Sequence, residues 1–115
     1  MSNKSFEELK EYVLDWADDK DLLHEANADK QFMKFIEEVF EFKSELDLYT
    51  THVGKMKDLS TVHLKDEMGD IFVTLIILCE QIGIDPVECL SMAYEKIKGR
   101  NGKTINGTFV KESDL

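Results

Sequence analysis

Residues 67–79 read EMGDIFVTLIILC, and this stretch decides the fold. Its second half is apolar on nearly every side except at Thr74, which is typical of a helix at the centre of a bundle. Glu67 and Asp70 share one stripe of this helix with Thr74, and His63 lies on the same stripe one turn earlier. Carboxylates on a helix that is otherwise buried are an anomaly, because burial of a charge without a partner is costly.

A second acidic group lies in residues 37–41, which read EEVFE. On a helix, Glu38 and Glu41 share one face with Lys34, whereas Glu37 points about 100° away from Glu38. A solvent-exposed face remains an equally good interpretation of Glu38 and Glu41 taken alone. Acids on two successive helices that converge in an apolar bundle favour a divalent cation between them. Oxygen ligands suit Mg²⁺ or Mn²⁺ rather than Zn²⁺, and the histidines that a carboxylate-bridged di-iron bundle needs are missing from the motifs.

Hydrophobic periodicity and capping signals predict four helices. We expect helices over residues 5–20, 28–49, 60–83 and 85–98, a loop over 50–59 and a short tail over 100–115 with two Asn-Gly turn signals. A capping box at Ser5 and Glu8 starts the first helix, Gly83 caps the end of the third, and Pro86 takes the first position of the fourth. The sequence therefore predicts an all-α, four-helix bundle that forms a single domain over residues 1–115.

Composition narrows the classes of partner. The chain has 115 residues and a formal net charge of -10. This charge disfavours nucleic acid polymers and anionic membranes, which bind through dense Lys and Arg contacts. The first four residues lack the apolar stretch of a signal peptide, and the longest apolar run, residues 71–79, is far shorter than the roughly 20 residues that span a bilayer. We therefore expect a cytoplasmic protein, and a small anionic ligand stays possible if metal ions bridge it to the chain.

Taken together, the motifs resemble the signature of the MazG-like nucleotide pyrophosphohydrolases of the all-α NTP pyrophosphatase superfamily. The double motif is Glu-Glu-x-x-Glu at residues 37–41 and, after 25 intervening residues, Glu-x-x-Asp at residues 67–70. Residues 30–34 (KQFMK) and 94–103 (YEKIKGRNGK) also resemble segments of this family. The ending at residues 106–112 is most similar to small phage-type members.

This resemblance implies a reaction and a set of site residues. The family hydrolyses nucleoside triphosphates, here expected to be dNTPs, to the monophosphate and pyrophosphate with Mg²⁺, and it builds homodimers or homotetramers. The metal ligands that the resemblance implies are Glu38, Glu41, Glu67 and Asp70. Either Glu38 or Glu41 would accept the proton of the attacking water, and Glu37 would act indirectly or at a second metal. A hydrolase specific for ppGpp, dUTP or dCTP and a non-enzymatic helical oligomer with an acidic face stay open as alternatives.

Substrate contacts are expected mainly from the basic segment near the C-terminus. The residues that the resemblance assigns to phosphate binding are Lys96, Arg100 and Lys103. Basic residues at a helix end also complement the helix dipole, so a purely structural role stays open for them. Lys34 either contacts phosphate or pairs with Glu38 one turn later. Trp16 could stack on a base, although aromatic residues at helical spacing belong more often to the core.

Overall fold

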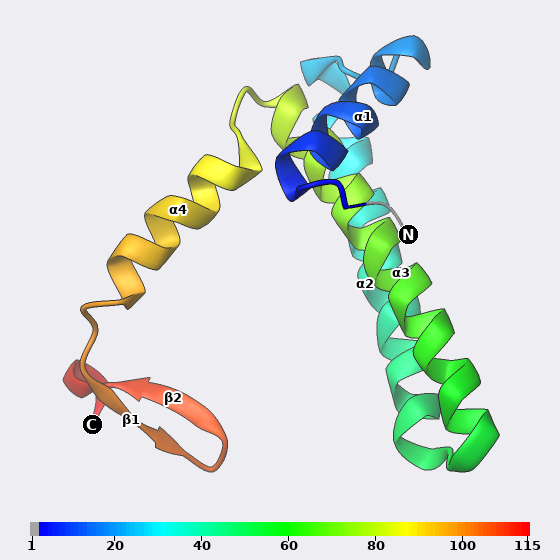
Figure 1. Ribbon diagram of the computed structural model, residues 1–115. Helices are drawn as coiled ribbons and strands as arrows, with labels where there is room; N and C mark the ends of the chain where they lie inside the picture. Colours follow the sequence, from blue (N-terminus) through cyan, green and yellow to red (C-terminus); the bar gives the residue numbers. More distant parts are fainter. Residues whose placement is uncertain (1–2) are drawn as a thin grey trace. The chain divides into compact units, whose positions relative to one another are not determined.

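Residues 3–115 are described by a computed structural model, and they form four α-helices and one β-hairpin (Figure 1). The helices are α1 (Phe6–Asp19), α2 (Ala28–Thr51), α3 (Gly54–Gln81) and α4 (Pro86–Ile97). The hairpin pairs β1 (Gly102–Ile105) with β2 (Thr108–Lys111), and short 3-10 helices cover Glu25–Asn27 and Glu112–Asp114. The predicted all-α fold with four helices is confirmed.

The contacts of the chain divide it into two compact units, Met1–Asp85 and Pro86–Leu115. The first unit holds α1, α2 and α3, and the second holds α4 and the hairpin. The single domain over residues 1–115 stays a prediction, because a division by contacts does not decide whether the two units fold together. None of the helices formed by residues 3–115 is long and apolar enough to cross a membrane.

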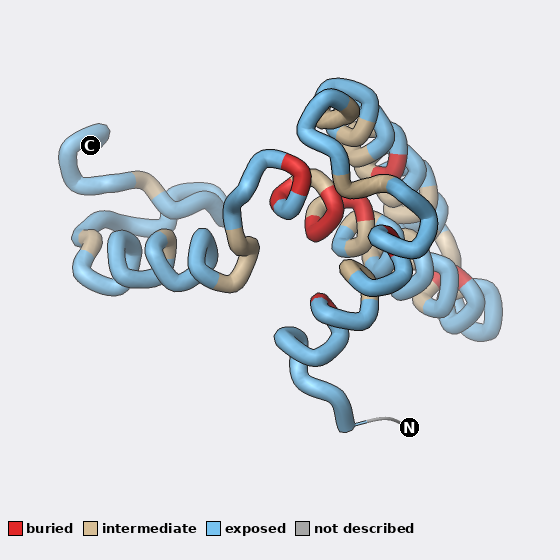
Figure 2. Tube along the Cα trace, turned by 90° about the horizontal axis from the view of Figure 1, so that it is seen from above, coloured by how far each residue is buried: buried red, intermediate tan, exposed pale blue. Residues whose placement is uncertain are grey.

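The helix α1 begins and packs as its sequence indicates. The Ser5 hydroxyl accepts a hydrogen bond from the backbone N–H of Glu8 at 3.1 Å, and the Glu8 carboxylate accepts one from the N–H of Ser5 at 3.2 Å, which confirms the predicted capping box. At its first residue α1 contacts α3, where the rings of Phe6 and Phe72 meet edge to face with centroids 5.9 Å apart. The buried apolar residues of this unit are Ala17, Ile76, Ile77 and Cys79 (Figure 2).

The helices α2 and α3 form a long hairpin with only His52 and Val53 between them. The predicted loop over residues 50–59 and the predicted start of the next helix at residue 60 are therefore wrong. Gly54 has a φ of 59°, a conformation that glycine adopts without strain, so the chain reverses within two residues. Residues 55–59 (KMKDL) include three charged residues, but Lys, Met and Leu are good helix formers, and charged side chains alone do not end a helix.

The end of α3 is a complete Schellman motif. The N–H of Ile84 donates to the carbonyl of Cys79 at 2.9 Å, and the N–H of Gly83 donates to the carbonyl of Glu80 at 3.2 Å. Gly83 has a φ of 77°, as this motif requires. The helix itself ends at Gln81, and the predicted capping role of Gly83 is confirmed.

The second unit begins at Pro86, as predicted for the fourth helix. Its C-terminal part, expected as a tail with turns, forms the antiparallel pair β1–β2. The turn residues Asn106 and Gly107 have φ values of 51° and 80°, which match the two-residue hairpin turn that Asn-Gly favours. The turn signal at Asn106-Gly107 is confirmed, whereas the one at Asn101-Gly102 is wrong, because Gly102 begins β1. Strands of four residues are too short to show a periodicity in the sequence.

Candidate metal centre between two helices

Three carboxylates from α2 and α3 meet in the middle of the helical hairpin. One oxygen each of Glu38, Glu67 and Asp70 lies within 4.8 Å of the other two. Glu38 is 7% exposed, Glu67 is half-buried and Asp70 is exposed at the mouth of the group. The structure thus brings together three of the four acids that the resemblance assigns to metal binding. We call these three residues the acidic cluster.

The acidic cluster is the centre of a longer row of polar residues between α2 and α3. The row consists of Gln31, Glu38 and Glu45 on α2 and of Glu67, Thr74 and Gln81 on α3, and we call it the polar seam. Each set repeats every seven residues, which is close to two helical turns, so each set occupies one face of its helix. On either side of the cluster, Gln31 Nε2 donates to the carbonyl of Thr74 at 3.1 Å, and Glu45 Oε1 lies 3.2 Å from His63 Nδ1.

Two oxygens of the acidic cluster are buried without a donor. Neither Glu38 Oε2 nor Glu67 Oε2 accepts a hydrogen bond from any group in residues 3–115. Burial and the neighbouring charges of Asp70 and Glu38 raise the pKa of Glu67. Burial, followed by the charges of Asp66 and Glu38, likewise raises the pKa of Asp70. Oxygens that repel one another and lack donors suit a hard divalent cation, so the residues present fit Mg²⁺.

Glu41 lies at the edge of the acidic cluster. Its side chain is exposed, and it is not a member of the group whose oxygens meet within 4.8 Å. The negative charge of Glu38 is the main cause that raises the pKa of Glu41. Metal binding by Glu41 stays a prediction. Its raised pKa and its exposure agree as well with the other predicted role, in which Glu41 accepts the proton of the attacking water.

Lys34 and Glu37 occupy the solvent side of α2 next to the acidic cluster. Lys34 Nζ lies 3.3 Å from Glu38 Oε1 and 3.7 Å from Glu37 Oε2. The bond to Glu38 is the main cause that raises the pKa of Lys34. Of the two roles weighed for Lys34, pairing with Glu38 is present, and contact with phosphate stays a prediction. Glu37 contacts Lys34 and is exposed, so its indirect role stays a prediction as well.

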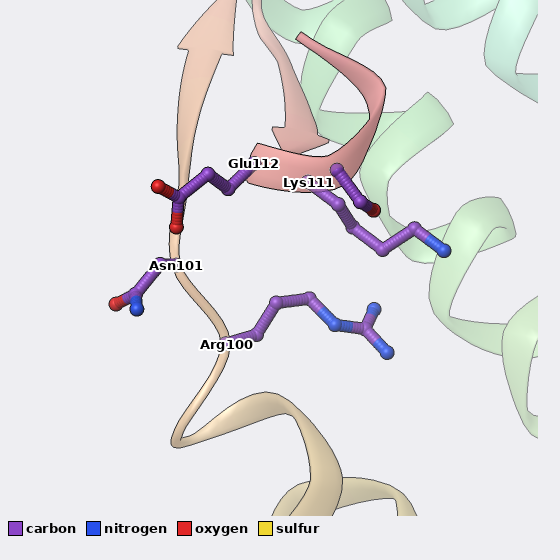
Figure 3. A pocket seen from close by; sticks show the side chains of 5 residues that line it. Arg100, Asn101, Lys111 and Glu112 are labelled. Atoms are coloured by element: carbon purple, nitrogen blue, oxygen red, sulfur yellow. The ribbon is translucent and has the colours of Figure 1, made fainter.

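The three predicted phosphate-binding residues, Lys96, Arg100 and Lys103, belong to the second unit. Residues 86–115 hold five of the 14 Lys and Arg residues but only four of the 24 acids. Arg100 lines a hollow of about 490 Å³, into which Lys111 also points (Figure 3). No ion pair within residues 3–115 involves Lys96, Arg100 or Lys103, so their charges are open to an anion.

Trp16 lines an apolar hollow on the surface of α1. Its side chain is 52% exposed, so it is not part of the core. The hollow has a volume of about 360 Å³, and its other lining residues are Leu9, Tyr12, Val13 and Val73. Contact between Trp16 and a base stays a prediction.

Sequence reasoning did not single out Gln31 and Gln81, which lie at the far end of the polar seam. Both line a polar hollow of about 310 Å³ together with Leu22, Asn27 and Lys30. Gln81 Nε2 donates to the carbonyl of Leu22 at 2.8 Å, while the Oε1 of Gln81 is buried with no donor among residues 3–115. The signal that could have identified Gln81 is the seven-residue step from Glu67 through Thr74, which continues the polar stripe of α3 to its end.

A comparison with known proteins finds a phage relative. The chain is 35% identical over 81 residues to the "Uncharacterized 18.2 kDa protein in rep-hol intergenic region" of Haemophilus phage HP1. The match covers 70% of this chain and 44% of the phage protein, so the chain spans less than half the length of this relative. No protein-family model and no solved structure matches the chain.

Proposed function

We propose that this protein is a MazG-like, Mg²⁺-dependent hydrolase that converts nucleoside triphosphates, preferentially dNTPs, to the monophosphate and pyrophosphate. The observation that carries the proposal is the pair of buried carboxylate oxygens, on Glu38 and Glu67, that have no donor within residues 3–115. A helix pair kept only for its stability gains nothing from such oxygens, because each unpaired buried acceptor costs free energy. The resemblance of the double motif to the pyrophosphohydrolases supplies the reaction class.

Each acid near the cluster has a distinct part in this proposal. Glu38, Glu67 and Asp70 would hold Mg²⁺, and the chemistry that the ion supplies when bound is neutralisation of phosphate charge and a lower pKa of the attacking water. Glu41 lies beside these ligands and has a raised pKa, which makes its carboxylate a stronger base for the proton of that water. Lys34 partly neutralises Glu38 and presents a cation at the exposed rim, where phosphate oxygens would approach.

The experiment that tests the proposal is product analysis by ³¹P NMR with NTPs, dNTPs and ppGpp, each with Mg²⁺ and with EDTA. We expect a nucleoside monophosphate and pyrophosphate that are lost in EDTA. Glu41→Gln should abolish turnover and leave helicity unchanged, since Glu41 is exposed. Retained activity in Glu41→Gln would remove it from the site.

A matched control separates loss of chemistry from loss of charge. Asp58→Asn removes one exposed carboxylate from α3, and Asp58 is not part of the acidic cluster, so its turnover should equal that of the wild type. Release of pyrophosphate from ppGpp alone would reassign the protein to alarmone hydrolysis. No turnover with any nucleotide would leave the non-enzymatic oligomer as the better interpretation.

We also propose that the chain forms a homodimer or homotetramer. The support is a set of large apolar side chains that lie exposed on the first unit, among them Leu9, Trp16 and Phe40 at 48%, 52% and 66%. Contact with a second copy would remove this surface from water, which is the main driving force for association. Light scattering after size-exclusion chromatography should give a mass of at least two chains, and a monomer mass would refute the oligomer.

A further inference from the structure

The polar hollow at the end of the polar seam has the features of a recognition site. Its two carboxamides are both held by backbone carbonyls through their NH₂ groups, Gln31 by Thr74 and Gln81 by Leu22. These bonds orient both amides, because a flip would place an amide oxygen against a carbonyl oxygen. The Oε1 atoms are therefore left as the acceptors of two residues that line a hollow of about 310 Å³.

One of these acceptors has a strong need for a donor. Gln81 is 5% exposed, and its Oε1 accepts no hydrogen bond within residues 3–115. A buried acceptor without a donor costs free energy, so a group that donates to it gains in binding. Two acceptors in one hollow are matched best by an NH₂ group, which carries two hydrogens. A cationic amine is disfavoured because Lys30 also lines the hollow.

The position of the hollow relates it to the acidic cluster. Gln31 precedes Glu38 by seven residues on the same face of α2, a rise of about 10 Å along the helix axis. On the facing helix, Thr74 contacts Gln31 and follows Asp70 by one turn. A nucleotide reaches over this separation from its base to its phosphates, so one nucleotide can occupy both places.

We propose that this hollow receives the nucleotide's base and prefers a base with an exocyclic amino group, as in cytosine or adenine. This inference rests on the proposed function, since it assumes that the phosphates bind at the acidic cluster. Cytosine would donate its amino hydrogens to Gln31 and Gln81 and would accept from Lys30 at its ring nitrogen or carbonyl. Uracil presents a carbonyl where cytosine has the amine, so two acceptors would face a third acceptor.

The test compares α,β-imido analogues of dCTP and dUTP, which cannot release pyrophosphate, by calorimetry with Mg²⁺. We expect the Kd of the dCTP analogue to be lower by a factor on the order of 10 to 100. This is the discrimination typical of two hydrogen bonds from side chains to one base. In ¹⁵N-edited NMR spectra, the side-chain amide signals of Gln31 and Gln81 should shift with this analogue. Equal Kd values, no binding of either analogue, or binding that leaves both amide signals unmoved would overturn base recognition.

Two variants give the inference an independent check. Gln81→Met keeps the side-chain volume but removes the acceptor, and the preference for the dCTP analogue should fall toward one. This change also leaves the Leu22 carbonyl without its side-chain donor, and Gln31→Met, on the partly exposed side of the hollow, does the same to the Thr74 carbonyl, so the two variants are interpreted together. Glu80→Gln, an exposed neighbour on α3, is the matched control and should keep the preference. A preference retained in both methionine variants would refute the assignment.

The outcomes for the base and for the reaction can be told apart. Hydrolysis of dCTP and dUTP with equal kcat/KM, together with equal binding, would overturn base recognition and leave the proposed reaction standing. Preferential binding of the dCTP analogue without turnover of dCTP would overturn the reaction and leave the base site standing.

Discussion

The substitution Glu38→Gln should change stability in opposite directions without and with Mg²⁺. In EDTA, the variant loses the repulsion between Glu38 and Asp70, so it should be at least as stable as the wild type. With Mg²⁺, the variant lacks a ligand oxygen, so the wild type should become the more stable protein. A purely structural acid would give the same sign under both conditions.

The magnitude follows from the separation of the charges. Oxygens of Glu38 and Asp70 lie within 4.8 Å of each other. At that distance, two like charges repel by about 0.9 kcal/mol in bulk water and about 3.5 kcal/mol at an effective dielectric constant of 20. Because Asp70 is exposed, the lower figure is the better guide. Loss of the pair with Lys34 costs roughly 0–1 kcal/mol, so the metal-free variant should be more stable by about 0–1 kcal/mol.

The gain from Mg²⁺ follows from mass action. At a free concentration 100 times its Kd, the ion stabilises the wild type by about 2.7 kcal/mol. For a cooperative unit of this size, that corresponds to a rise in Tm of roughly 10–15 °C. Glu38→Gln should keep only a small part of this rise.

Thermal unfolding followed by circular dichroism, with EDTA and with a series of Mg²⁺ concentrations, measures both effects. Asp58→Asn is the control, because it also removes one negative charge from this helical hairpin but should keep the full response to Mg²⁺. If Glu38→Gln keeps the wild-type rise in Tm with Mg²⁺, or if the wild type shows no rise at millimolar Mg²⁺, Glu38 is not a ligand of the ion.

Three further predictions concern stability. The pKa values of Glu41, Glu67 and Asp70 are raised in the folded chain, so the folded chain binds protons at these carboxylates more tightly than the unfolded chain does. The urea concentration at the unfolding midpoint, measured without metal, should therefore rise when the pH is lowered from 7 to 5.5. A fall in this midpoint would contradict the raised pKa values. Gly83→Ala should lower the free energy of unfolding by about 1–2 kcal/mol in urea titrations, because Gly83 has a φ of 77°. Gly69→Ala should raise it by about 0.5–1 kcal/mol, because Gly69 lies within α3 and an added Cβ would meet no atom within 4 Å.

The sequence was sufficient for the elements that depend on local signals. The capping box at Ser5 and the glycine cap at Gly83 are formed by residues within a few positions of one another, so their chemistry is visible in the chain. The start of α3 was not predictable in this way. Residues 55–59 follow a glycine and carry three charges, as a loop often does, and their helical state depends on the reversal at Gly54, after which the helix continues through the buried Ser60.

The acidic cluster was predictable in part for a similar reason. Helical spacing puts Glu67 and Asp70 on one stripe, and the apolar residues that follow indicate a buried helix. The sequence does not decide whether Glu38 or Glu41 faces that stripe. The choice depends on which flank of α2 meets α3, and one amphipathic pattern with acids three residues apart is compatible with either flank. The structure selects Glu38 as the buried acid and leaves Glu41 exposed.

The polar seam also bears on why these residues occupy this place. Leucine or valine at Glu38 and Glu67 would fill the same space between α2 and α3 without repulsion or unpaired acceptors, and apolar replacements of buried charges are often neutral or stabilising. The same holds for Gln81, whose amide oxygen is buried without a donor in residues 3–115. All three residues lie on the same two facing stripes, with seven-residue spacing, and residues 71–79 of α3, which lie between Glu67 and Gln81, are apolar except at Thr74. Destabilising polar groups that are aligned in this way are expected where a ligand supplies the missing partners, a cation at one place and a hydrogen-bond donor at the other.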